Sequence, residues 1–323
     1  MCEFALYSEH FTKTMKYPQT LKPELMPKYP YYIISKGRAS SRYTSRTFEE
    51  IGLPYHIVIE PQEYDDYAAV IDPKKIIVTD FSNLKQGSIP VRNFVWEHAV
   101  NAGHKGYWIC DDNIRNLYRL YNHTKIAVTN PYLLRSCEDF IDRYENVGMA
   151  GLNYAFFAPA HSKRPPYYLN TRCYSFIWLR TDIDQRWRVS PTGPYNEDTD
   201  LSLRILKDNY CTLLFNHLLC GKMSTHTMKG GNTDEVYKVG SEEYDKRKKF
   251  AEGLVMQHPD CVELTWKWGR WHHSVDYTIF RQQLKFKPEL IGKIPIGAVN
   301  EYGTKLKVVP SSLADDESDT VED

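Results

Sequence analysis

Long apolar runs are missing from this sequence. Hydrophobic residues make up 42% of its 323 residues, but no run approaches the roughly 18 to 20 apolar residues that a membrane-spanning helix requires. The first 17 residues also lack the order of a signal peptide, in which positive charges precede an apolar segment. We therefore expect a chain that neither enters a membrane nor is secreted.

Paired cysteines are also missing. The chain has seven cysteines, an odd number, and no two of them have the C-x-x-C spacing that many zinc and redox sites share. Cys110, Cys173, Cys211 and Cys220 lie in or beside apolar stretches, where a reduced thiol packs as a small hydrophobic group. The pattern favours buried free thiols and a reducing, cytoplasmic location.

Four familiar enzyme signatures are absent. The sequence contains no G-x-x-x-x-G-K-[ST], no G-x-G-x-x-G after a strand-like run, no H-E-x-x-H and no G-x-S-x-G. These motifs mark P-loop nucleotidases, Rossmann dehydrogenases, zinc peptidases and lipase-type hydrolases. The sequence therefore gives no support to any of those classes.

Positive and negative side chains balance only because of the C-terminal tail. Lys+Arg and Asp+Glu both number 41, and 6 of the acids lie in residues 311–323, which contain no Lys or Arg. Residues 1–310 therefore carry 41 − 35 = +6. We expect a disordered acidic tail and a mildly basic body, which tolerates a polyanionic partner without proving one.

Short apolar runs alternate with amphipathic stretches, which is typical of an α/β protein with a mostly parallel sheet flanked by crossover helices. Strands are expected at residues 31–35, 56–60, 75–79, 107–110, 147–152, 173–179 and 211–215. Helices are expected at residues 43–51, 87–103, 131–144, 198–206 and 242–256. The predicted organisation is a lead-in over 1–30, a core over 31–234, a helical and aromatic-basic C-terminal extension over 235–310, and the tail over 311–323.

Adjacent acids follow one of the expected strands. In an open parallel sheet, ligands bind beyond the carboxyl ends of the strands, and the apolar run 107–110 ends in Asp111, Asp112 and Asn113. Neighbouring carboxylates can hold a divalent cation that also binds a diphosphate. A solvated turn or a helix N-cap explains the same residues without a ligand, because Asp and Asn favour both.

Two further polar clusters lie downstream. Glu197, Asp198 and Asp200 open an expected helix, where acids are favoured by the helix dipole alone. His226 and Lys229 share a glycine-rich loop, which could close over phosphates or be an ordinary turn.

Five segments, taken in order, form a recognisable set. They are ISKGR (34–38), VIEPQEY (58–64), GSIPVRN (87–93) with WEHA (96–99), YWICDDNI (107–114) and NEDTD (196–200). The set resembles the TET/JBP-associated glycosyltransferases, a family with kinetoplastid members and with bacteriophage members that modify DNA. The resemblance covers residues 31–231, and the order of its segments is more specific than any one motif.

This resemblance implies a GT-A-type glycosyltransferase that takes its sugar from a UDP-sugar. It also implies a divalent metal, Mn²⁺ or Mg²⁺, held by a D-x-D-type motif, and an acceptor hydroxyl on 5-hydroxymethylcytosine or 5-hydroxymethyluracil in DNA. The motif here is Asp111-Asp112-Asn113, which departs from a strict D-x-D by ending in Asn. If a bacteriophage encodes the chain, its compartment is the host cytoplasm.

Resemblance and position together suggest roles for individual residues. Asp198 is the expected base that deprotonates the acceptor in an inverting reaction, with Glu197 as second choice and Asp200 as an acid on the helix face. The expected metal ligands are Asp111, Asn113 and His226. The expected donor-binding residues are Ser35, Lys36, Arg38, Glu60, Asp80, Arg92, Asp111, Asp112 and Lys229. Glu60 and Asp80 are equally well explained as solvated acids at strand ends.

An aromatic and basic stretch lies beyond the region of resemblance. The candidate DNA contacts in it are Trp266, Lys267, Trp268, Arg270 and Trp271. Indole rings stack on unpaired or flipped bases, and basic side chains bind phosphates. Tryptophans packed in a core are the commoner explanation of such a stretch.

Other functions stay open at this stage. The same fold serves glycosyltransferases with a protein or glycan acceptor, and sugar nucleotidyltransferases, which release pyrophosphate instead of UDP. A non-catalytic DNA-binding module is the third alternative. Such a module would keep its DNA affinity when Asp111 is replaced by Ala, and it would turn over no donor.

Overall fold

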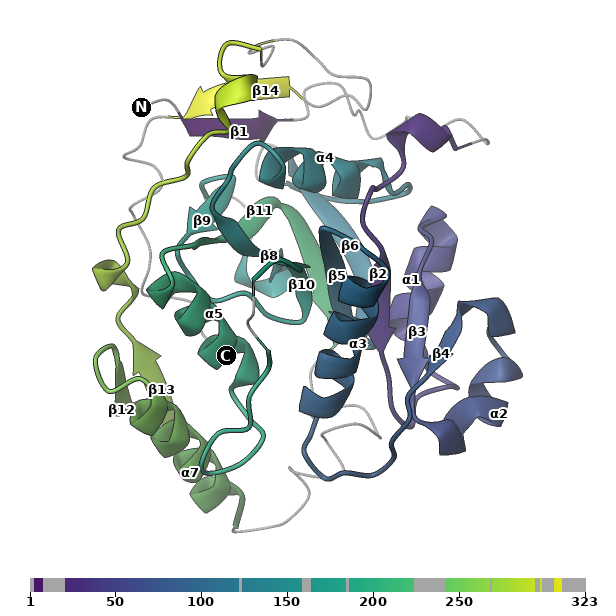
Figure 1. The fold of residues 1–323 in the computed structure, drawn as a ribbon, viewed down its shortest axis with the longest axis vertical. Helices are drawn as coiled ribbons and strands as arrows, with labels where there is room; N and C mark the ends of the chain where they lie inside the picture. Colours follow the sequence, from purple (N-terminus) through teal and green to yellow (C-terminus); the bar gives the residue numbers. More distant parts are fainter. Residues whose placement is uncertain are drawn as a thin grey trace.

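One large mixed sheet organises the fold (Figure 1). The computed structural model of the chain describes residues 3–7, 21–121, 124–158, 164–183, 186–223, 242–267, 269–293, 297 and 305–309. Ten strands form the sheet in the order β4-β3-β2-β5-β10-β8-β11-β6-β7, with β9 paired to β11. Their bounds are β2 (Tyr31–Ile34), β3 (His56–Ile59), β4 (Ile76–Val78), β5 (Gly106–Asp111), β6 (Ile114–Tyr121), β7 (Thr124–Ala127), β8 (Val147–Tyr154), β9 (Tyr167–Leu169), β10 (Phe176–Arg180) and β11 (Cys211–Lys222).

Most strands of the sheet share one direction. β4, β3, β2 and β5 pair in parallel, and so do β8 and β11. β10 lies antiparallel between β5 and β8, and β6 and β9 are antiparallel to β11. β7 is antiparallel to β6, so seven of the ten strands run the same way. The predicted α/β class with a mostly parallel sheet is confirmed.

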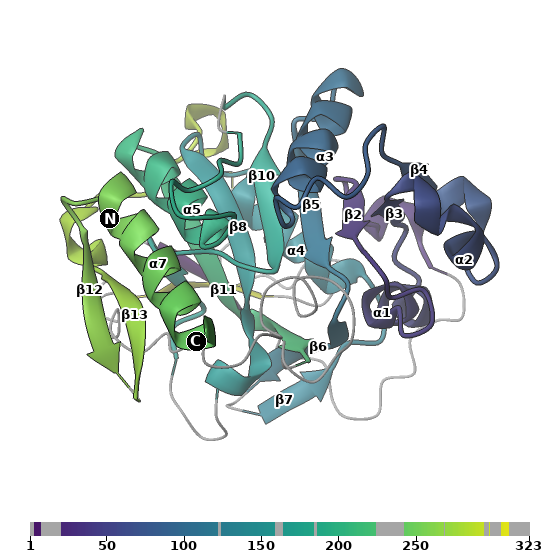
Figure 2. The ribbon, with the colours of Figure 1, turned by 90° about the horizontal axis from the view of Figure 1, so that it is seen from below.

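Helices cover both faces of this sheet (Figure 2). On one face, the core contains Phe48 of α1, Tyr67 of α2 and Leu134 of α4. On the other, it contains Val95 of α3 and Leu201 of α5. The bounds of these helices are α1 (Tyr43–Ile51), α2 (Tyr64–Ala68), α3 (Ile89–Asn101), α4 (Tyr132–Ile141) and α5 (Glu197–Lys207).

Strand β5 shows how the sequence produces this sandwich. Tyr107 and Ile109 point into the core with α3 and α5, while Trp108 and Cys110 point into the core with α1 and α4. Side chains alternate along a strand, and a parallel strand covered on both faces is apolar at every position. The first polar residue after this run, Asp111, therefore lies where the strand leaves the core.

Helix α1 spans the residues expected for it, and its end has a clear local cause. Gly52 takes a left-handed conformation, with φ of 72°, and its backbone N–H donates to Glu49 O at 3.2 Å. Glycine adopts this conformation without the steric penalty that a Cβ brings. The apolar spacing before it and the glycine after it were enough to predict both limits.

Strand β11 is longer than expected, because it continues to Lys222. The prediction ended it at Phe215, where the apolar run meets Asn216. Asn216 is buried, yet its Oδ1 accepts from Asn153 Nδ2 at 2.8 Å and its Nδ2 donates to Pro165 O at 3.0 Å. A polar side chain with both groups bonded can stay inside a strand. The sequence pattern also did not predict β6, β7 and β9.

The C-terminal part packs beside α5 in both views (Figures 1 and 2). Helix α7 (Glu242–Gln257) is followed by a hairpin of β12 (Val262–Lys267) and β13 (Arg270–Val275). Leu203 of α5 and Leu254 of α7 share one small core with Val262 of β12. The helix was expected, but the aromatic-basic stretch was not assigned to strands.

Two segments far apart in the sequence form a small separate sheet, and the lead-in is tied to α4. Strand β1 (Glu3–Tyr7) pairs with β14 (Lys305–Val309), and Lys28 of the lead-in forms ion pairs with Asp139 at 2.5 Å and Asp142 at 2.6 Å, at the end of α4. The predicted boundaries at residues 30, 234 and 310 stay predictions. The tail over 311–323 lies outside the described residues.

Two sequence-based expectations concern cysteines and membranes. The six cysteines in the described part of the chain are buried and free, as predicted. None of the helices described here combines the length and the apolar character needed to cross a membrane.

Candidate active site

A cavity of about 790 Å³ opens beyond the carboxyl ends of β2, β3 and β5. Its lining includes Ile34, Ile59 and Asp111, the last residues of those strands. The start of α5 and the hairpin β12–β13 also contribute to it. This is the edge of the sheet at which ligands of α/β proteins bind.

Asp111 lies in this cavity among positive charges. Its Oδ2 accepts from Lys222 Nζ at 3.0 Å and from Ser175 Oγ at 2.8 Å, and its Oδ1 accepts from Arg92 Nη2 at 3.3 Å. Burial acts to raise the pKa of Asp111, but the charges of Lys222 and Arg92 outweigh it and hold the pKa below its ordinary value. Asp111 is therefore a carboxylate whose two oxygens already bind cations.

Asp112 lies in the turn after β5 and has different partners from Asp111. It is buried, forms an ion pair with Arg38 Nη1 and accepts from Ser35 Oγ at 2.7 Å. Burial raises the pKa of Asp112 although Arg38 opposes it. Ser35 Oγ also lies 2.5 Å from Tyr67 Oη. These contacts fix the turn after β2 against the turn after β5.

Arg92 joins the two acidic motifs that the sequence placed far apart. It is 3% exposed, and its Nη2 lies 3.3 Å from Asp111 Oδ1 and 3.5 Å from Asp198 Oδ1. Its Nε lies 3.7 Å from Glu197 Oε1, and its guanidinium stacks over Trp187 at 4.5 Å from the ring centre. A planar guanidinium suits such a site, because it donates in several directions at once.

The acids of α5 enter the cavity at the start of that helix. Asn196 precedes them with a left-handed φ of 62°, which Asn tolerates better than most residues. Glu197 Oε1 accepts from Ser88 Oγ at 2.7 Å. Asp198 Oδ1 is buried and has no hydrogen-bond partner, although Arg92 is near. Burial raises the pKa of Asp198 to about 7, with Arg92 opposing and Glu197 reinforcing the change.

Asp200, expected to be an acid on the face of the helix, lies away from the cavity. It is buried and faces α7, with its Oδ1 at 2.9 Å from His258 Nε2 and its Oδ2 at 2.9 Å from Arg204 Nη2. Lys207 Nζ lies 3.0 Å from His258 Nδ1. An ammonium can only donate, so Nδ1 accepts and Nε2–H donates to Asp200. Asp200 thus links α5 to α7 and does not line the cavity.

Lys36 and Glu60 form a second polar pair at the ends of β2 and β3. Lys36 Nζ lies 3.2 Å from Glu60 Oε1, and Glu60 Oε2 accepts from the backbone N–H of Asn83 at 3.0 Å. Burial acts to raise the pKa of Glu60, but hydrogen bonds from Gln62, Asn83 and Lys36 lower it below its ordinary value. Both residues line the cavity, whereas Asp80 is exposed and lies outside the lining.

The hairpin β12–β13 brings part of the aromatic-basic stretch to the cavity. Arg270 and Trp271 line it, and Trp271 meets Trp266 edge to face, with ring centres 5.2 Å apart. Trp266 is 54% exposed and Lys267 is also exposed, so neither is a core residue. Trp268 lies outside the described residues. So do the predicted metal ligand His226 and the predicted donor-binding residue Lys229.

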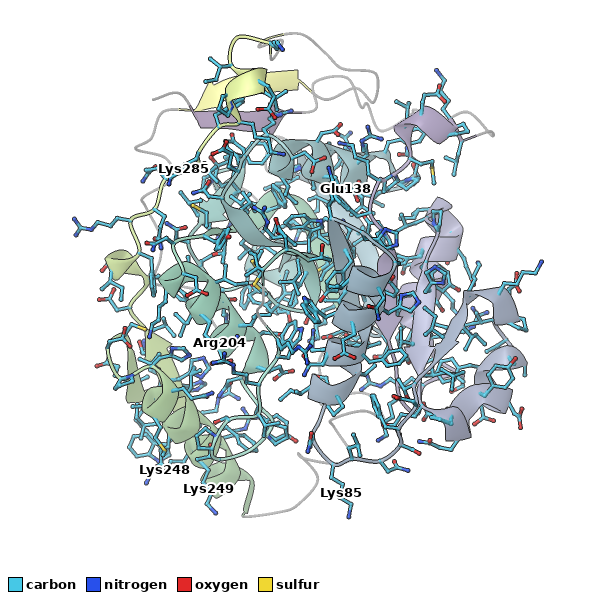
Figure 3. The ribbon with its side chains drawn as sticks, viewed as in Figure 1. Lys85, Glu138, Arg204, Lys248, Lys249 and Lys285 are labelled. Carbon is cyan, nitrogen blue, oxygen red and sulfur yellow. The ribbon has the colours of Figure 1, made fainter. Side chains whose placement is uncertain are left out.

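Further basic residues surround the cavity. Figure 3 shows Lys85 from the loop before α3, and Lys248 and Lys249 from α7, at the same end of the molecule. The basic lining residues are Lys36, Arg38, Lys85, Arg92, Arg172, Lys222, Arg247 and Arg270, and the acidic ones are Glu60, Asp111, Asp112, Glu197 and Asp198. With histidines neutral, the lining carries 8 − 5 = +3.

The sequence pattern missed three polar residues of this site. They are Ser175, Lys222 and Tyr154, which meet at Asp111: Lys222 Nζ lies 2.8 Å from Ser175 Oγ and 3.3 Å from Tyr154 Oη. Each lies at or next to the end of a strand that pairs with a distant segment. A strand boundary predicted correctly at residue 222 would have singled out Lys222.

The described part of the predicted metal site does not match a metal donor set. Both oxygens of Asp111 bind cations, Asp112 is bound to Arg38, and Asn113 offers one neutral oxygen, Oδ1, which is buried without a partner. Within the described ranges, no group of three His, Cys, Asp or Glu side chains is arranged to hold a metal. With His226 outside those ranges, the three-ligand set stays a prediction.

Comparison with known proteins supports one assignment. Among solved structures, the chain is similar to a protein from Desulfovibrio desulfuricans G20 described as a nucleotide-diphospho-sugar transferase. The two share 9% identity over 59% of this chain and 80% of that chain, with a TM-score of 0.35. No curated protein matches the chain.

A family model gives the decisive match. The model described as TET-Associated Glycosyltransferase matches residues 29–231, which is 203 of the 323 residues. The matched span contains Arg92, Asp111, Asp198 and Lys222, and it ends before α7 and the hairpin. The chain belongs to the TET-Associated Glycosyltransferase family.

Proposed function

We propose that this glycosyltransferase moves a sugar from a UDP-sugar to the hydroxyl of a 5-hydroxymethylpyrimidine in DNA, with inversion at the anomeric carbon. The observation that carries the proposal is the Asp198 carboxylate. Its Oδ1 is buried without a hydrogen-bond partner in a cavity that also holds Asp111 and Arg92. A carboxylate that has an oxygen without a hydrogen bond and a pKa near neutrality suits proton abstraction at physiological pH.

The proposed step is a single displacement. Asp198 takes the proton of the acceptor hydroxyl while that oxygen forms a bond to the anomeric carbon of the sugar. The bond from that carbon to the β-phosphate oxygen breaks, and UDP leaves with the electron pair. The proton on Asp198 later passes to solvent. The sugar is then bonded to the acceptor oxygen, with the configuration at its anomeric carbon inverted.

Glu197 is the weaker candidate for this base. Its Oε1 already accepts from Ser88 Oγ at 2.7 Å and lies 3.7 Å from Arg92 Nε. This oxygen is therefore already occupied by Ser88. We assign Glu197 to positioning of Arg92 and Ser88, with Asp198 left to receive the proton.

The donor is proposed to lie along the ends of β2, β3 and β5. Lys36 and Glu60 offer a donor and an acceptor for the nucleoside, and Arg92 offers charge to the diphosphate. Arg38, Ser35 and Asp112 are bound to one another. We therefore assign them to holding this edge of the site, and Asp80, which faces solvent, is left out.

The acceptor is proposed to enter from the side of the hairpin β12–β13. Trp271 and Arg270 line the cavity from this hairpin, and the lining is positive overall. A base inside a duplex cannot reach a deep pocket without leaving its stack, and aromatic faces stabilise a base that has done so. Phe156, which is 58% exposed in the cavity lining, offers a second such face.

Release of UDP tests this proposal. A panel of UDP-sugars is incubated with DNA that carries 5-hydroxymethylcytosine, 5-hydroxymethyluracil or no modification, for the wild type and for Asp198→Asn. We expect release that requires modified DNA and that the substitution removes. Release that ignores modified DNA would refute the acceptor and favour a protein or glycan, and release of pyrophosphate would indicate a nucleotidyltransferase.

A further inference from the structure

Lys222 is a half-buried cation in the cavity lining with no role so far. Its side chain is 17% exposed and belongs to the cavity lining. Its Nζ lies 3.0 Å from Asp111 Oδ2, 2.8 Å from Ser175 Oγ and 3.3 Å from Tyr154 Oη. Since an ammonium has three N–H groups, each of them has an acceptor, and the exposed part of the group faces the cavity.

The sheet fixes Lys222 beside the turn that carries the D-x-D-type motif. Lys222 is the last residue of β11, where it pairs with Ile114 after an irregularity at Gly221. The next backbone N–H, that of Met223, donates to Asn113 O at 2.9 Å. The ammonium is therefore placed by strand pairing, not by a mobile loop.

A divalent cation competes with Lys222 for the same carboxylate. Both oxygens of Asp111 are within 3.3 Å of a positively charged nitrogen. A metal bound there would lie a few ångströms from two fixed cations and would be repelled by both. Asn113 adds only one neutral oxygen, whereas Mg²⁺ and Mn²⁺ sites are built mainly from carboxylates and water.

The charge of the lining is opposite to that of a diphosphate. The diphosphate of a UDP-sugar carries two negative charges at neutral pH, and the lining carries +3 with histidines neutral. A donor therefore brings the lining to about +1 without any added ion. The chain itself supplies the opposite charge that a bound metal would otherwise supply.

We propose that Lys222, rather than a divalent metal, binds the diphosphate of the donor and balances its charge as UDP departs. The inference rests on the proposed function, because it needs a UDP-sugar in this cavity. Lys222 keeps its three protons throughout. One N–H turns from its acceptor in the protein to a β-phosphate oxygen, while the bond to the sugar breaks and the electron pair goes to that phosphate.

Calorimetric titration with UDP tests the inference without depending on turnover. The wild-type protein is treated with EDTA, and UDP is titrated in EDTA and again with Mn²⁺. Uridine, which has no phosphates, is titrated in parallel. We expect UDP dissociation constants that agree within about threefold in the two buffers, and transfer activity that persists in EDTA.

Substitutions of Lys222 test whether its charge binds the diphosphate. Lys222→Met should weaken UDP binding more than tenfold and leave uridine binding unchanged, whereas Lys222→Arg should retain most of the affinity. Lys105→Met is the matched control, because it removes the same charge from an exposed position outside the lining, and it should leave UDP binding unchanged. Thermal unfolding of each variant shows whether it is folded.

Each outcome has a distinct meaning. UDP binding that appears only with Mn²⁺ would overturn the role of Lys222 while leaving the donor assignment intact. Equal UDP affinity of a folded Lys222→Met and the wild type would overturn it as well. A wild type that binds UDP in neither buffer would refute the donor of the proposed function, and this inference with it.

Discussion

Replacement of Asp198 by Asn tests the assignment of the base. The amide has the shape of the carboxylate but cannot accept a proton at neutral pH. Loss of a general base lowers rates by about 10²- to 10⁴-fold, and we expect a fall of this size in kcat. The matched control is Glu197→Gln on the same helical turn, which should cost less, because Glu197 Oε1 is already hydrogen-bonded to Ser88 Oγ.

The pH profile of the wild type follows from the same carboxylate. Burial raises the pKa of Asp198 to about 7, and only the ionised form can take a proton. We therefore expect kcat/KM to rise with pH, with a midpoint near 7, and to level off above pH 8. Glu197 interacts with Asp198, so the midpoint belongs to the acidic pair as a whole.

Stability should change in the opposite direction. The folded-state pKa of Asp198 is raised by about 3 above its ordinary value, so the folded protein binds this proton more tightly than the unfolded chain. Its contribution to stability is present at low pH and is lost as pH rises from about 4 through 7. Three pKa units correspond to roughly 4 kcal/mol at most, and because the side chain is 22% exposed we expect about 1 to 2 kcal/mol.

Urea unfolding at pH 5 and pH 8, combined with UDP release over pH 5 to 9, measures both effects. Glu138, another buried acid whose pKa is raised to about 7, loses stability over the same range in both proteins, so the wild type should lose about 1 to 2 kcal/mol more unfolding free energy between those two pH values than Asp198→Asn. A variant that keeps wild-type turnover, or a wild type whose activity is flat across pH 7, would refute the assignment of Asp198 as the base.

Three further substitutions separate charge, acceptor binding and fold. Arg92→Met leaves three acids without their shared partner, so turnover should fall at least about 100-fold and unfolding free energy by about 3 to 5 kcal/mol in urea titrations; an active, stable variant would contradict this. Trp271→Ala should weaken binding of modified single-stranded DNA by about 1 to 3 kcal/mol in fluorescence anisotropy with UDP affinity unchanged, and unaltered DNA affinity would remove the hairpin from the acceptor site. Gly52→Ala should destabilise the fold by about 1 to 2 kcal/mol, because the residue has a φ of 72° and the new Cβ would clash with Leu21. UDP affinity should not change, and a variant with the melting temperature of the wild type would disprove the strain.

The parts of the fold that local pattern determines were predictable. Helix α1 was placed from its apolar spacing and Gly52, and β5 from an uninterrupted apolar run that ends in acids. Because β5 is covered on both faces, its first polar residue had to lie at the edge of the sheet. Asp111 and the start of α5 could therefore be named as site residues before any coordinates.

The parts that depend on distant contacts were not predictable. Lys222 reaches Asp111 because β11 continues through Asn216, and that continuation depends on an amide from Asn153 on β8. Asp200 is buried because His258, 58 residues away, provides a partner. Single-sequence patterns contain neither contact, so Lys222 was not among the predicted site residues and Asp200 was not predicted to be buried.

Mass spectrometry of the nucleosides released from treated DNA tests the central claim most directly. DNA with 5-hydroxymethylcytosine or 5-hydroxymethyluracil is incubated with the wild type and a UDP-sugar, digested, and compared with the same reaction of Asp198→Asn. The account predicts a nucleoside heavier by one sugar residue, formed only from modified DNA and only by the wild type. Donor turnover that leaves every nucleoside unchanged in mass would contradict it.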